Sequence, residues 1–311
     1  MKIVISEFMD DAAVDHLRVA FGAENVRYDA KLVDQPAALA QAVADCDAFI
    51  VRNRTQVRGD LLAACAKARV IGRLGVGLDN IDVPACEARG MKVIPATGAN
   101  ALAVAEYVVG TAMMLRRASY QSTSDVASGK WPRNALSNGR ETMGAMLGLI
   151  GFGSIGQLTA KLARAVGMSV IAYDPALPAD HPAWSELAVA RVSIDDLITL
   201  SDVVSLHVPL VDSTKNMFDA GRISKMKAGA ILINTARGGI VDDAAVAAAL
   251  RSGALGGAAI DVFTNEPLPA STVFDGCPNL VLTPHIAGVT AEANVRVSSM
   301  IAAAVIAELK G

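Results

Sequence analysis

The sequence predicts an α/β protein made of two domains, each built on a parallel sheet. Short apolar segments alternate with Ala-rich stretches along the whole chain, which is typical of strands joined by crossover helices. At 311 residues the chain exceeds what one hydrophobic core usually serves, so two domains with a cleft between them are expected. Hydrophobic residues make up 52% of the chain and aromatic residues only 4%, which indicates well-filled layers of aliphatic side chains.

Two series of predicted strands follow one another along the chain. The first comprises Lys2–Ser6, Val26–Tyr28, Ala48–Val51, Val70–Arg73 and Lys92–Ile94. The second has the length of a complete six-stranded dinucleotide-binding fold and comprises Met146–Ile150, Ser169–Tyr173, Val203–His207, Ala230–Asn234, Gly257–Val262 and Leu280–Leu282. Helical segments separate the strands in both series.

Between the two series, the apolar stretch Ala101–Arg117 predicts a long crossover helix. A polar, irregular segment that contains Gly129, Trp131 and Pro132 follows it and predicts an extended arm at about 119–145. The last predicted helix, about Ala291–Leu309, has no later element to pack against, so we expect it to return to the first domain.

The expected first domain is therefore discontinuous, and its chain crossings lie near 98–102 and 284–290. The expected domain boundaries are 1–99 with 285–311 for one domain and 100–284 for the other.

Composition excludes several classes of protein. A net charge of −3 provides no basic field for a phosphate backbone, so nucleic acid is not an expected partner. The apolar run at residues 3–5 meets Glu7 and Asp10 at once, as in a strand and not a signal peptide. No apolar run approaches the roughly 20 residues that cross a bilayer, so no membrane contact is expected. The expected location is the cytoplasm. Cys46, Cys65, Cys86 and Cys277 lack metal-ligand or CxxC spacing and are expected to be free thiols.

A glycine-rich turn directly follows the predicted strand that ends at Ile150. It reads Gly151-Phe-Gly153-Ser154-Ile155-Gly156 and opens a predicted helix. A GxGxxG pattern alone is weak evidence, but this strand–turn–helix context predicts a pyrophosphate site: Gly151 permits the turn, Gly153 lets the backbone approach the ligand, and Gly156 lets the helix lie on its strand.

Asp174 ends the next predicted strand, 18 residues after Gly156, where such a fold needs a ribose ligand. A carboxylate there accepts from the ribose hydroxyls and repels a 2′-phosphate, so we expect NAD rather than NADP. A solvated acid at a strand end is the alternative interpretation of Asp174.

Three polar residues each lie just beyond an apolar strand of the second series: Arg237, Glu266 and His285. Ligands bind at the carboxyl ends of parallel strands. Hydride transfer at a secondary alcohol needs a cation for the carboxylate and carbonyl, an acid/base for the hydroxyl proton, and a group that orients the base. Arg237, His285 and Glu266 match these three needs. Each residue alone could instead be an ordinary surface ion-pair former or cap.

The chain resembles the D-isomer-specific 2-hydroxyacid dehydrogenase family, especially its phosphoglycerate-dehydrogenase-like members, along essentially its whole length. The motifs that carry the resemblance, in order, are Arg73–Asn80, Asn100–Glu106, the glycine-rich turn, Ser201–Pro209, Asn234–Gly239, Gly257–Pro267 and Thr283–Gly288. The resemblance implies a Rossmann NAD-binding domain inserted into a discontinuous, flavodoxin-like substrate domain. It also implies homodimers in which each arm embraces the other subunit.

The resemblance assigns further residues to the site. Val76 and Gly77 would hold the substrate carboxylate by backbone N–H groups, with Asn100 beside the substrate at the hinge. The implied cofactor contacts beyond the glycine-rich turn and Asp174 are His207, Pro209, Thr214, Thr235, Ala236, Arg237, Asp261, His285 and Gly288. His207 could equally be an ordinary core histidine.

Arg52 and Arg54, after the third strand, add cations near the expected substrate mouth and favour an acid with a second anion. (S)-Sulfolactate, which has the D arrangement in space, and 3-phosphoglycerate fit this pattern. Glyoxylate, hydroxypyruvate and D-lactate are the alternatives. Asn294 stands where members with a phosphoglycerate site often carry Gln, and the chain ends at Gly311 without the regulatory domain of serine-feedback enzymes, which weakens the case for phosphoglycerate.

Two other functional interpretations are compatible with the same fold. NAD-sensing corepressors resemble the same family, but no basic tail indicates a chromatin partner. The formate dehydrogenase branch generally has Gln at the position of Glu266, and hydride transfer from formate needs no acid/base. A carboxylate at this position therefore favours a hydroxy-acid substrate.

Overall fold

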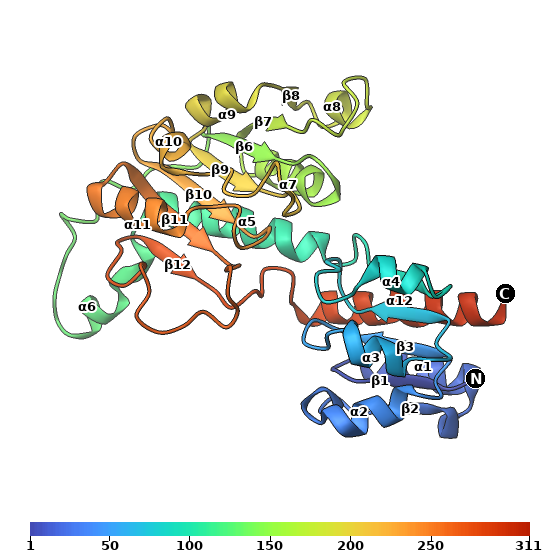
Figure 1. Cartoon of the computed structure of the whole chain (residues 1–311). Coiled ribbons are helices and arrows are strands. Elements are labelled where there is room, and N and C mark those ends of the chain that lie inside the picture. The colour runs from blue at the N-terminus through green and yellow to red at the C-terminus, as the bar shows by residue number, and fades with distance from the viewer. The chain divides into compact units, whose positions relative to one another are not determined.

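The computed structural model describes all 311 residues and divides them into two compact units. Unit 1 consists of Met1–Asn100 and Val289–Gly311, and unit 2 of Ala101–Gly288. Each unit contains one sheet, and every strand pair in both sheets is parallel (Figure 1). The predicted α/β class with two parallel sheets is confirmed.

Unit 1 contains a five-stranded sheet in the order β2-β1-β3-β4-β5. Its strands are β1 (Ile3–Ile5), β2 (Val26–Tyr28), β3 (Ala48–Val51), β4 (Val70–Arg73) and β5 (Lys92–Pro95). The chain leaves β1 toward β2 on one side and returns to β3 on the other. Ligands of such sheets bind beyond the carboxyl ends of the strands at this kind of reversal.

Helices cover both faces of the unit 1 sheet, which explains why its central strands β1 and β3 are apolar and buried throughout. They are α1 (Asp11–Phe21), α2 (Pro36–Val43), α3 (Gly59–Ala64), α4 (Val83–Glu87) and α12 (Ala291–Lys310), with short 3₁₀ turns at Ala23–Asn25 and Leu32–Asp34. Val14 of α1 and Ile301 of α12 pack on the face of Ile3 and Ile50, whereas α2, α3 and α4 pack on the face of Phe49.

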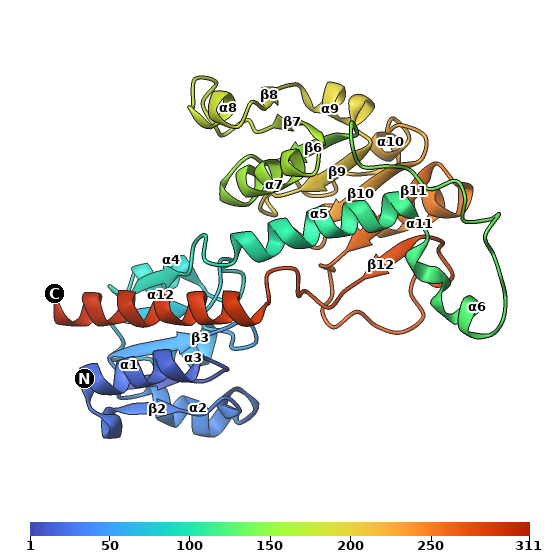
Figure 2. The same ribbon diagram turned by 180° about the vertical axis from the view of Figure 1, so that it is seen from behind.

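Helix α12, from the end of the chain, belongs to unit 1 and lies beside α1 (Figure 2). It begins where the Thr290 hydroxyl accepts a hydrogen bond from the backbone N–H of Ala293 at 3.0 Å. The approach to the sheet is close, because a side chain at Gly72 of β4 would collide with Ile301. The chain terminus therefore supplies part of the core of unit 1.

Unit 2 contains a seven-stranded sheet in the order β12-β11-β10-β9-β6-β7-β8. Its strands are β6 (Met146–Ile150), β7 (Ser169–Tyr173), β8 (Ala190–Arg191), β9 (Val203–Leu206), β10 (Ala230–Asn234), β11 (Leu255–Ile260) and β12 (Leu280–Leu282). The expected six strands are all present, although β11 begins two residues early. The two-residue edge strand β8 is additional.

Helices again cover both faces of the unit 2 sheet. They are α5 (Ala101–Arg117), α6 (Thr123–Ala127), α7 (Ser154–Ala165), α8 (Ala183–Glu186), α9 (Ile194–Leu200), α10 (Ala220–Ile223) and α11 (Asp243–Ser252), with a 3₁₀ turn at Tyr120–Ser122. Helices α5 and α7 pack on the face of Leu147 and Ile231, whereas α9, α10 and α11 pack on the face of Ile150 and Leu232.

The predicted arm is an excursion of unit 2 that carries α6 away from the sheet (Figures 1 and 2). Its large apolar side chains Trp131 and Met143 are 77% and 78% exposed. No helix of the chain has the length and apolar character needed to span a membrane. All four cysteines are free, and burial raises the pKa of Cys46 and Cys65 to about 12.

Candidate active site

The glycine-rich turn connects β6 to α7, and its three glycines differ in what surrounds them. Gly151 has a φ of +94°, and a side chain there would collide with the His207 carbonyl. A side chain at Gly156 would collide with the Gly151 carbonyl, whereas the space around Gly153 is open. Ser154 and Ile155 form the first turn of α7. The turn is thus tightly packed against the protein at Gly151 and Gly156 and open at Gly153, as the approach of a phosphate group requires.

Asp174, at the end of β7, faces the same turn. Its carboxylate accepts hydrogen bonds from the backbone N–H of Phe152 at 2.7 Å and of Ala176 and Leu177 at 2.9 and 3.1 Å. The side chain therefore anchors the glycine-rich turn, a role that the sequence did not suggest. A carboxylate has about four lone-pair positions, so capacity for a ribose hydroxyl remains.

The segment after β9 holds three of the expected cofactor residues. His207 donates its backbone N–H to the Ile150 carbonyl at 2.7 Å, and its Nε2 lies 3.0 Å from the Ser205 hydroxyl. Burial lowers the pKa of His207 to about 4, so the ring is neutral at neutral pH. Thr214 donates its hydroxyl to the Pro209 carbonyl at 2.6 Å and thereby closes the loop.

Arg237 lies in the turn after β10, and the buried side chain of Asn234 sets the shape of this turn. Asn234 Oδ1 accepts from the Ala236 N–H at 3.0 Å, and its Nδ2 donates to the Arg237 carbonyl at 3.0 Å. The Arg237 guanidinium donates to the Ala236 carbonyl at 2.6 Å. The neighbouring Thr235 hydroxyl is buried without a partner. An orphaned hydroxyl next to the expected nicotinamide ribose fits a bound dinucleotide.

The structure brings Glu266 and His285 together. Glu266 Oε2 lies 2.8 Å from His285 Nδ1, and Glu266 Oε1 accepts from the Phe263 N–H at 2.9 Å. The two side chains are only partly covered, at 37% and 46% exposed. With Nδ1 engaged by the carboxylate, Nε2 is the ring nitrogen that can exchange a proton with a ligand.

The loop that carries His285 is held by Asp261, which is 1% exposed. The Asp261 carboxylate accepts from the Thr283 hydroxyl at 2.6 Å and from the backbone N–H groups of Ile286 and Ala287 at 2.8 and 2.9 Å. Thr283 is also bonded to the Tyr107 hydroxyl at 2.7 Å. These bonds stabilise an uncommon backbone conformation, because His285 has a φ of +56°.

Arg237, Glu266 and His285 follow three strands that are direct neighbours in the sheet, β10, β11 and β12. The turn of Arg237 also contacts the loop of Glu266, because a side chain at Gly238 would overlap the backbone of Phe263. Gly288 is the last residue of unit 2. Unit 2 therefore places an arginine, a histidine and the carboxylate bonded to that histidine just beyond three neighbouring strands of its sheet.

The expected substrate residues lie in unit 1. The loop of Arg52 and Arg54 follows β3, and Val76 and Gly77 follow β4. Buried Asn80 ties these two loops together: its Nδ2 donates to the Thr55 carbonyl at 2.7 Å, and its own carbonyl accepts from the Val57 N–H at 2.8 Å.

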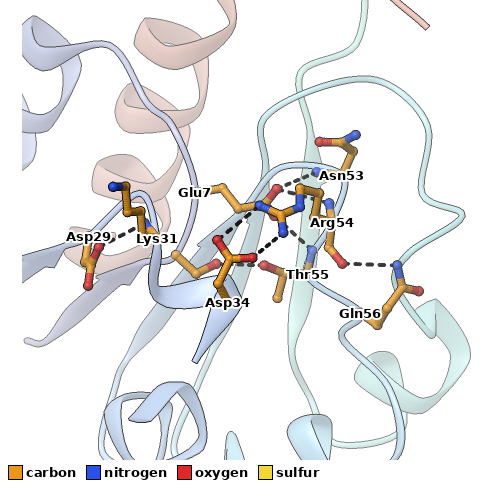
Figure 3. A network of polar contacts seen from close by, with 9 residues as sticks. Glu7, Asp29, Lys31, Asp34, Asn53, Arg54, Thr55 and Gln56 are labelled. Carbon is orange, nitrogen blue, oxygen red and sulfur yellow. Dashed lines mark hydrogen bonds and ion pairs between the residues drawn. The ribbon is translucent and has the colours of Figure 1, made fainter. Parts of the chain in front are cut away.

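The two arginines of this loop differ in their partners. The Arg54 guanidinium forms an ion pair with Asp34 (Figure 3). The Arg52 guanidinium instead donates to the neutral amide oxygen of Asn294 at 2.7 Å. Asn100, the last residue of this part of unit 1, has a buried side-chain oxygen without a partner.

The residues that sequence reasoning missed are Asn234, Thr283, Asn80 and Glu7, all of which hold loops of the site in place. Three of them lie inside or at the edge of motifs already singled out, and for Asn234 its position at the end of a predicted strand was an available signal. Glu7 gave no such signal, because its partners lie 45 to 48 residues away in the chain.

The geometry of unit 2 defines a dinucleotide-binding dehydrogenase. Residues 109–287 match the family model of the D-isomer specific 2-hydroxyacid dehydrogenase NAD binding domain. The chain is 51% identical to an (S)-sulfolactate dehydrogenase of Chromohalobacter salexigens over 95% of its own length and 94% of that protein. It is 42% identical to a hydroxypyruvate reductase of Thermotoga maritima over 83% of each chain.

A solved structure agrees with these relatives. D-Lactate dehydrogenase from Aquifex aeolicus, in complex with NAD and lactic acid, superposes with a TM-score of 0.83 at 26% identity, covering 100% of this chain and 96% of that one. The chain belongs to the D-isomer specific 2-hydroxyacid dehydrogenase family. It is an NAD-dependent oxidoreductase of 2-hydroxy acids.

Proposed function

We propose that this enzyme interconverts a short dianionic D-2-hydroxy acid, of the (S)-sulfolactate or 3-phosphoglycerate type, with its 2-keto acid. The observation that carries the proposal is the half-buried guanidinium of Arg52, which donates to the neutral amide of Asn294 and, unlike that of Arg54, forms no ion pair with a carboxylate. Its charge is available to a second anionic group of the substrate. The 51% identity to an (S)-sulfolactate dehydrogenase supports sulfolactate as the first candidate.

His285 is the proposed acid/base. During oxidation Nε2 takes the proton of the C2 hydroxyl, and the imidazolium that forms is stabilised by Glu266 at 2.8 Å from Nδ1. During reduction the same nitrogen returns the proton to the C2 oxygen.

Arg237 is the proposed electrophile. Its guanidinium holds the substrate carboxylate and the C2 oxygen, on which negative charge develops as the carbonyl is reduced. In unit 1, the backbone N–H groups of Val76 and Gly77 are proposed to bind a substrate carboxylate, and Asn100 is proposed to orient the substrate. Arg54, already paired with Asp34, contributes mainly by shaping the loop.

We further propose that unit 2 is the NAD-binding domain and unit 1 the substrate domain. NAD, when bound, supplies the nicotinamide carbon that accepts or donates the hydride. The residues proposed to hold it are Gly151, Gly153, Ser154, Ile155, Gly156, Asp174, His207, Pro209, Thr214, Thr235, Ala236, Arg237, Asp261, His285 and Gly288. Asp174 selects NAD over NADP by excluding a 2′-phosphate.

Two further proposals concern the assembly and the location of the enzyme. The exposed Trp131 and Met143 of the arm are large apolar side chains that a second copy of the chain would cover, which supports a homodimer. A cytoplasmic location is consistent with four free thiols, three of them buried.

Hydroxypyruvate reduction is the second candidate function, favoured by the 42% identity to a hydroxypyruvate reductase. Hydroxypyruvate and glyoxylate lack a second anion, so they do not need the charge of Arg52.

A panel of acids followed by NADH absorbance tests these proposals. We expect (S)-sulfolactate or 3-phosphoglycerate to have a higher kcat/KM than D-lactate. Arg52→Gln should raise the KM of the dianionic acid about tenfold or more and that of D-lactate less than about twofold. Arg27→Gln, an exposed charge loss on β2, is the matched control. Equal effects of Arg52→Gln on both acids would refute the second-anion contact, and no turnover of any acid would favour an NAD-sensing protein.

A further inference from the structure

Glu7, directly after β1, has a carboxylate that is almost completely buried, at 4% exposed. Four consecutive backbone N–H groups donate to it: Arg52 and Thr55 to Oε1 at 2.9 and 3.0 Å, Arg54 and Asn53 to Oε2 at 3.0 and 3.3 Å. Figure 3 shows Asn53, Arg54 and Thr55 around the Glu7 carboxylate. The loop after β3 is therefore wrapped around a single carboxylate.

These four bonds explain how a buried charge is tolerated. Burial raises the pKa of Glu7, but the hydrogen bonds from the backbone of Thr55, Arg54 and Arg52 outweigh burial and hold the pKa below its usual value. Glu7 is consequently ionised throughout the neutral range. An ionised acceptor also makes stronger hydrogen bonds than a neutral one.

The other side of the loop is fixed as well. Asn80 donates to the carbonyl of Thr55 at 2.7 Å and, more weakly, to that of Arg52 at 3.4 Å. The Ser6 and Thr55 hydroxyls are 3.0 Å apart. Because donors and acceptors of the loop are both engaged by buried side chains, the backbone of Arg52 has one well-defined position.

The far end of the Arg52 side chain is held by other elements. Asn294 of α12 accepts from the guanidinium at 2.7 Å, and the guanidinium lies over the ring of Phe8 at 5.6 Å from its centroid. Asn294 orients the cation without neutralising it. Arg54 differs in this respect, because Asp34 compensates its charge.

We propose that Glu7 and Asn294 are positioning residues for substrate charge selection, Glu7 fixing the backbone of Arg52 and Asn294 aiming its guanidinium. This inference rests on the proposed function, since Arg52 must contact the second anionic group of the substrate. Neither residue touches the reacting atoms, so both act through Arg52.

Two possible roles of Glu7 predict opposite changes in the KM of a dianionic acid when Glu7 is replaced by Gln. If Glu7 acted only through its negative charge, Glu7→Gln would make the loop more positive and lower the KM of a dianionic acid. If Glu7 positions the loop, the amide introduces an NH₂ group opposite backbone N–H donors, the loop loosens, and the KM rises.

The experiment measures steady-state kinetics of the full chain with (S)-sulfolactate and with D-lactate. The readout is the KM for (S)-sulfolactate divided by the KM for D-lactate. Glu7→Gln and Asn294→Ala should each raise this ratio about tenfold while kcat with sulfolactate changes less than about twofold. Glu7→Asp keeps the charge but is one methylene shorter, so it should raise the ratio less than Glu7→Gln does.

Asn294→Asp tests orientation against neutralisation. The carboxylate keeps the hydrogen-bond acceptor but compensates the charge of Arg52, so the ratio should rise at least as much as in Asn294→Ala. An unchanged ratio would contradict the role of a neutral partner. Asn294 is only partly buried, so these two variants decide the matter if thermal unfolding shows that Glu7→Gln does not fold.

The double variant Arg52→Gln with Glu7→Gln should have the same ratio as Arg52→Gln alone, because residues that act through one another are not additive. Glu24→Gln, an exposed change of the same chemistry in unit 1, is the control. If Arg52→Gln alters the ratio but the Glu7 and Asn294 variants do not, or if Glu7→Gln lowers it, this inference is overturned and the proposed function stands. If Arg52→Gln itself leaves the ratio unchanged, both fail.

Discussion

At the scale of single residues, carboxylates hold the loops of this enzyme by accepting backbone N–H groups. Asp174 anchors the glycine-rich turn, Asp261 anchors the loop of His285, and Glu7 anchors the loop of Arg52. A charged acceptor can satisfy several donors that irregular backbone would otherwise leave without partners. Each of the three acids follows a β-strand, so the strands position the acids and the acids position the loops.

His207 provides a prediction about pH at the same scale. Burial lowers its pKa to about 4 from 6.5, so between these values the unfolded chain binds a proton that the folded protein does not. Stability therefore falls as the pH decreases through this window. We expect the free energy of unfolding of the wild type to lose about 2 kcal/mol more than that of His207→Gln between pH 7 and pH 5, measured by urea denaturation without cofactor.

His16→Gln, a change on the exposed side of α1, is the control and should keep the pH dependence of the wild type. Parallel curves for the wild type and His207→Gln would show that the ring is not buried in its neutral form.

At the scale of elements, the glycines of the turn between β6 and α7 differ in why they lack a side chain: two are required by the fold, and the third is proposed to serve binding. Gly151 and Gly156 are needed by the free protein, because side chains there would collide with backbone carbonyls. Gly153 meets nothing in the free protein, and its φ of −75° suits any residue. The absence of a side chain at Gly153 therefore supports its proposed place in the cofactor site.

We therefore expect Gly153→Ala to fold with a thermal stability equal to or slightly above that of the wild type, since replacement of Gly reduces the entropy of the unfolded chain. The same variant should raise the KM for NAD about tenfold or more, because the new methyl group occupies the space of the pyrophosphate. Calorimetry and initial rates at varied NAD measure the two effects.

Gly110→Ala in α5, where a methyl group also meets no neighbour, is the matched control and should leave the KM for NAD unchanged. An unchanged KM in Gly153→Ala would remove this glycine from the cofactor site.

At the scale of the whole molecule, the arm is the part of unit 2 that lacks a packed core of its own. Trp131 and Met143 lie in it or at its end, and both are more than three-quarters exposed. Tryptophan and methionine are enriched at protein–protein interfaces relative to the rest of protein surfaces. The homodimer proposed above accounts for them, with a second copy of the chain as the partner.

The corresponding prediction concerns assembly. We expect the wild type to sediment as a dimer and Trp131→Ser to raise the dimer dissociation constant about tenfold or more, because a covered indole contributes about 1.5–3 kcal/mol. Val19→Ser, at a side chain of α1 that is 86% exposed, should not alter the constant. A wild type that is monomeric at micromolar concentration would refute the dimer.

The sequence by itself determined the α/β class, the strands that carry chemistry and the polar residues at their ends. Alternation of apolar strands with helices is a local signal, and a strand end such as Arg237 or His285 can be located from it. The two-residue edge strand β8 was missed because Ala190 and Arg191 are too short a run to show a period.

Tertiary structure alone decided which side chains meet. Arg52 bonds to Asn294 across 242 residues of chain, and Glu7 collects four N–H groups from a loop 45 to 48 residues away. Such contacts depend on the packing of β1, β3 and α12, and no local pattern encodes a separation of this kind. For the same reason the sequence presented Arg52 and Arg54 as equivalent cations, whereas the fold pairs Arg54 with an acid and leaves Arg52 beside a neutral amide.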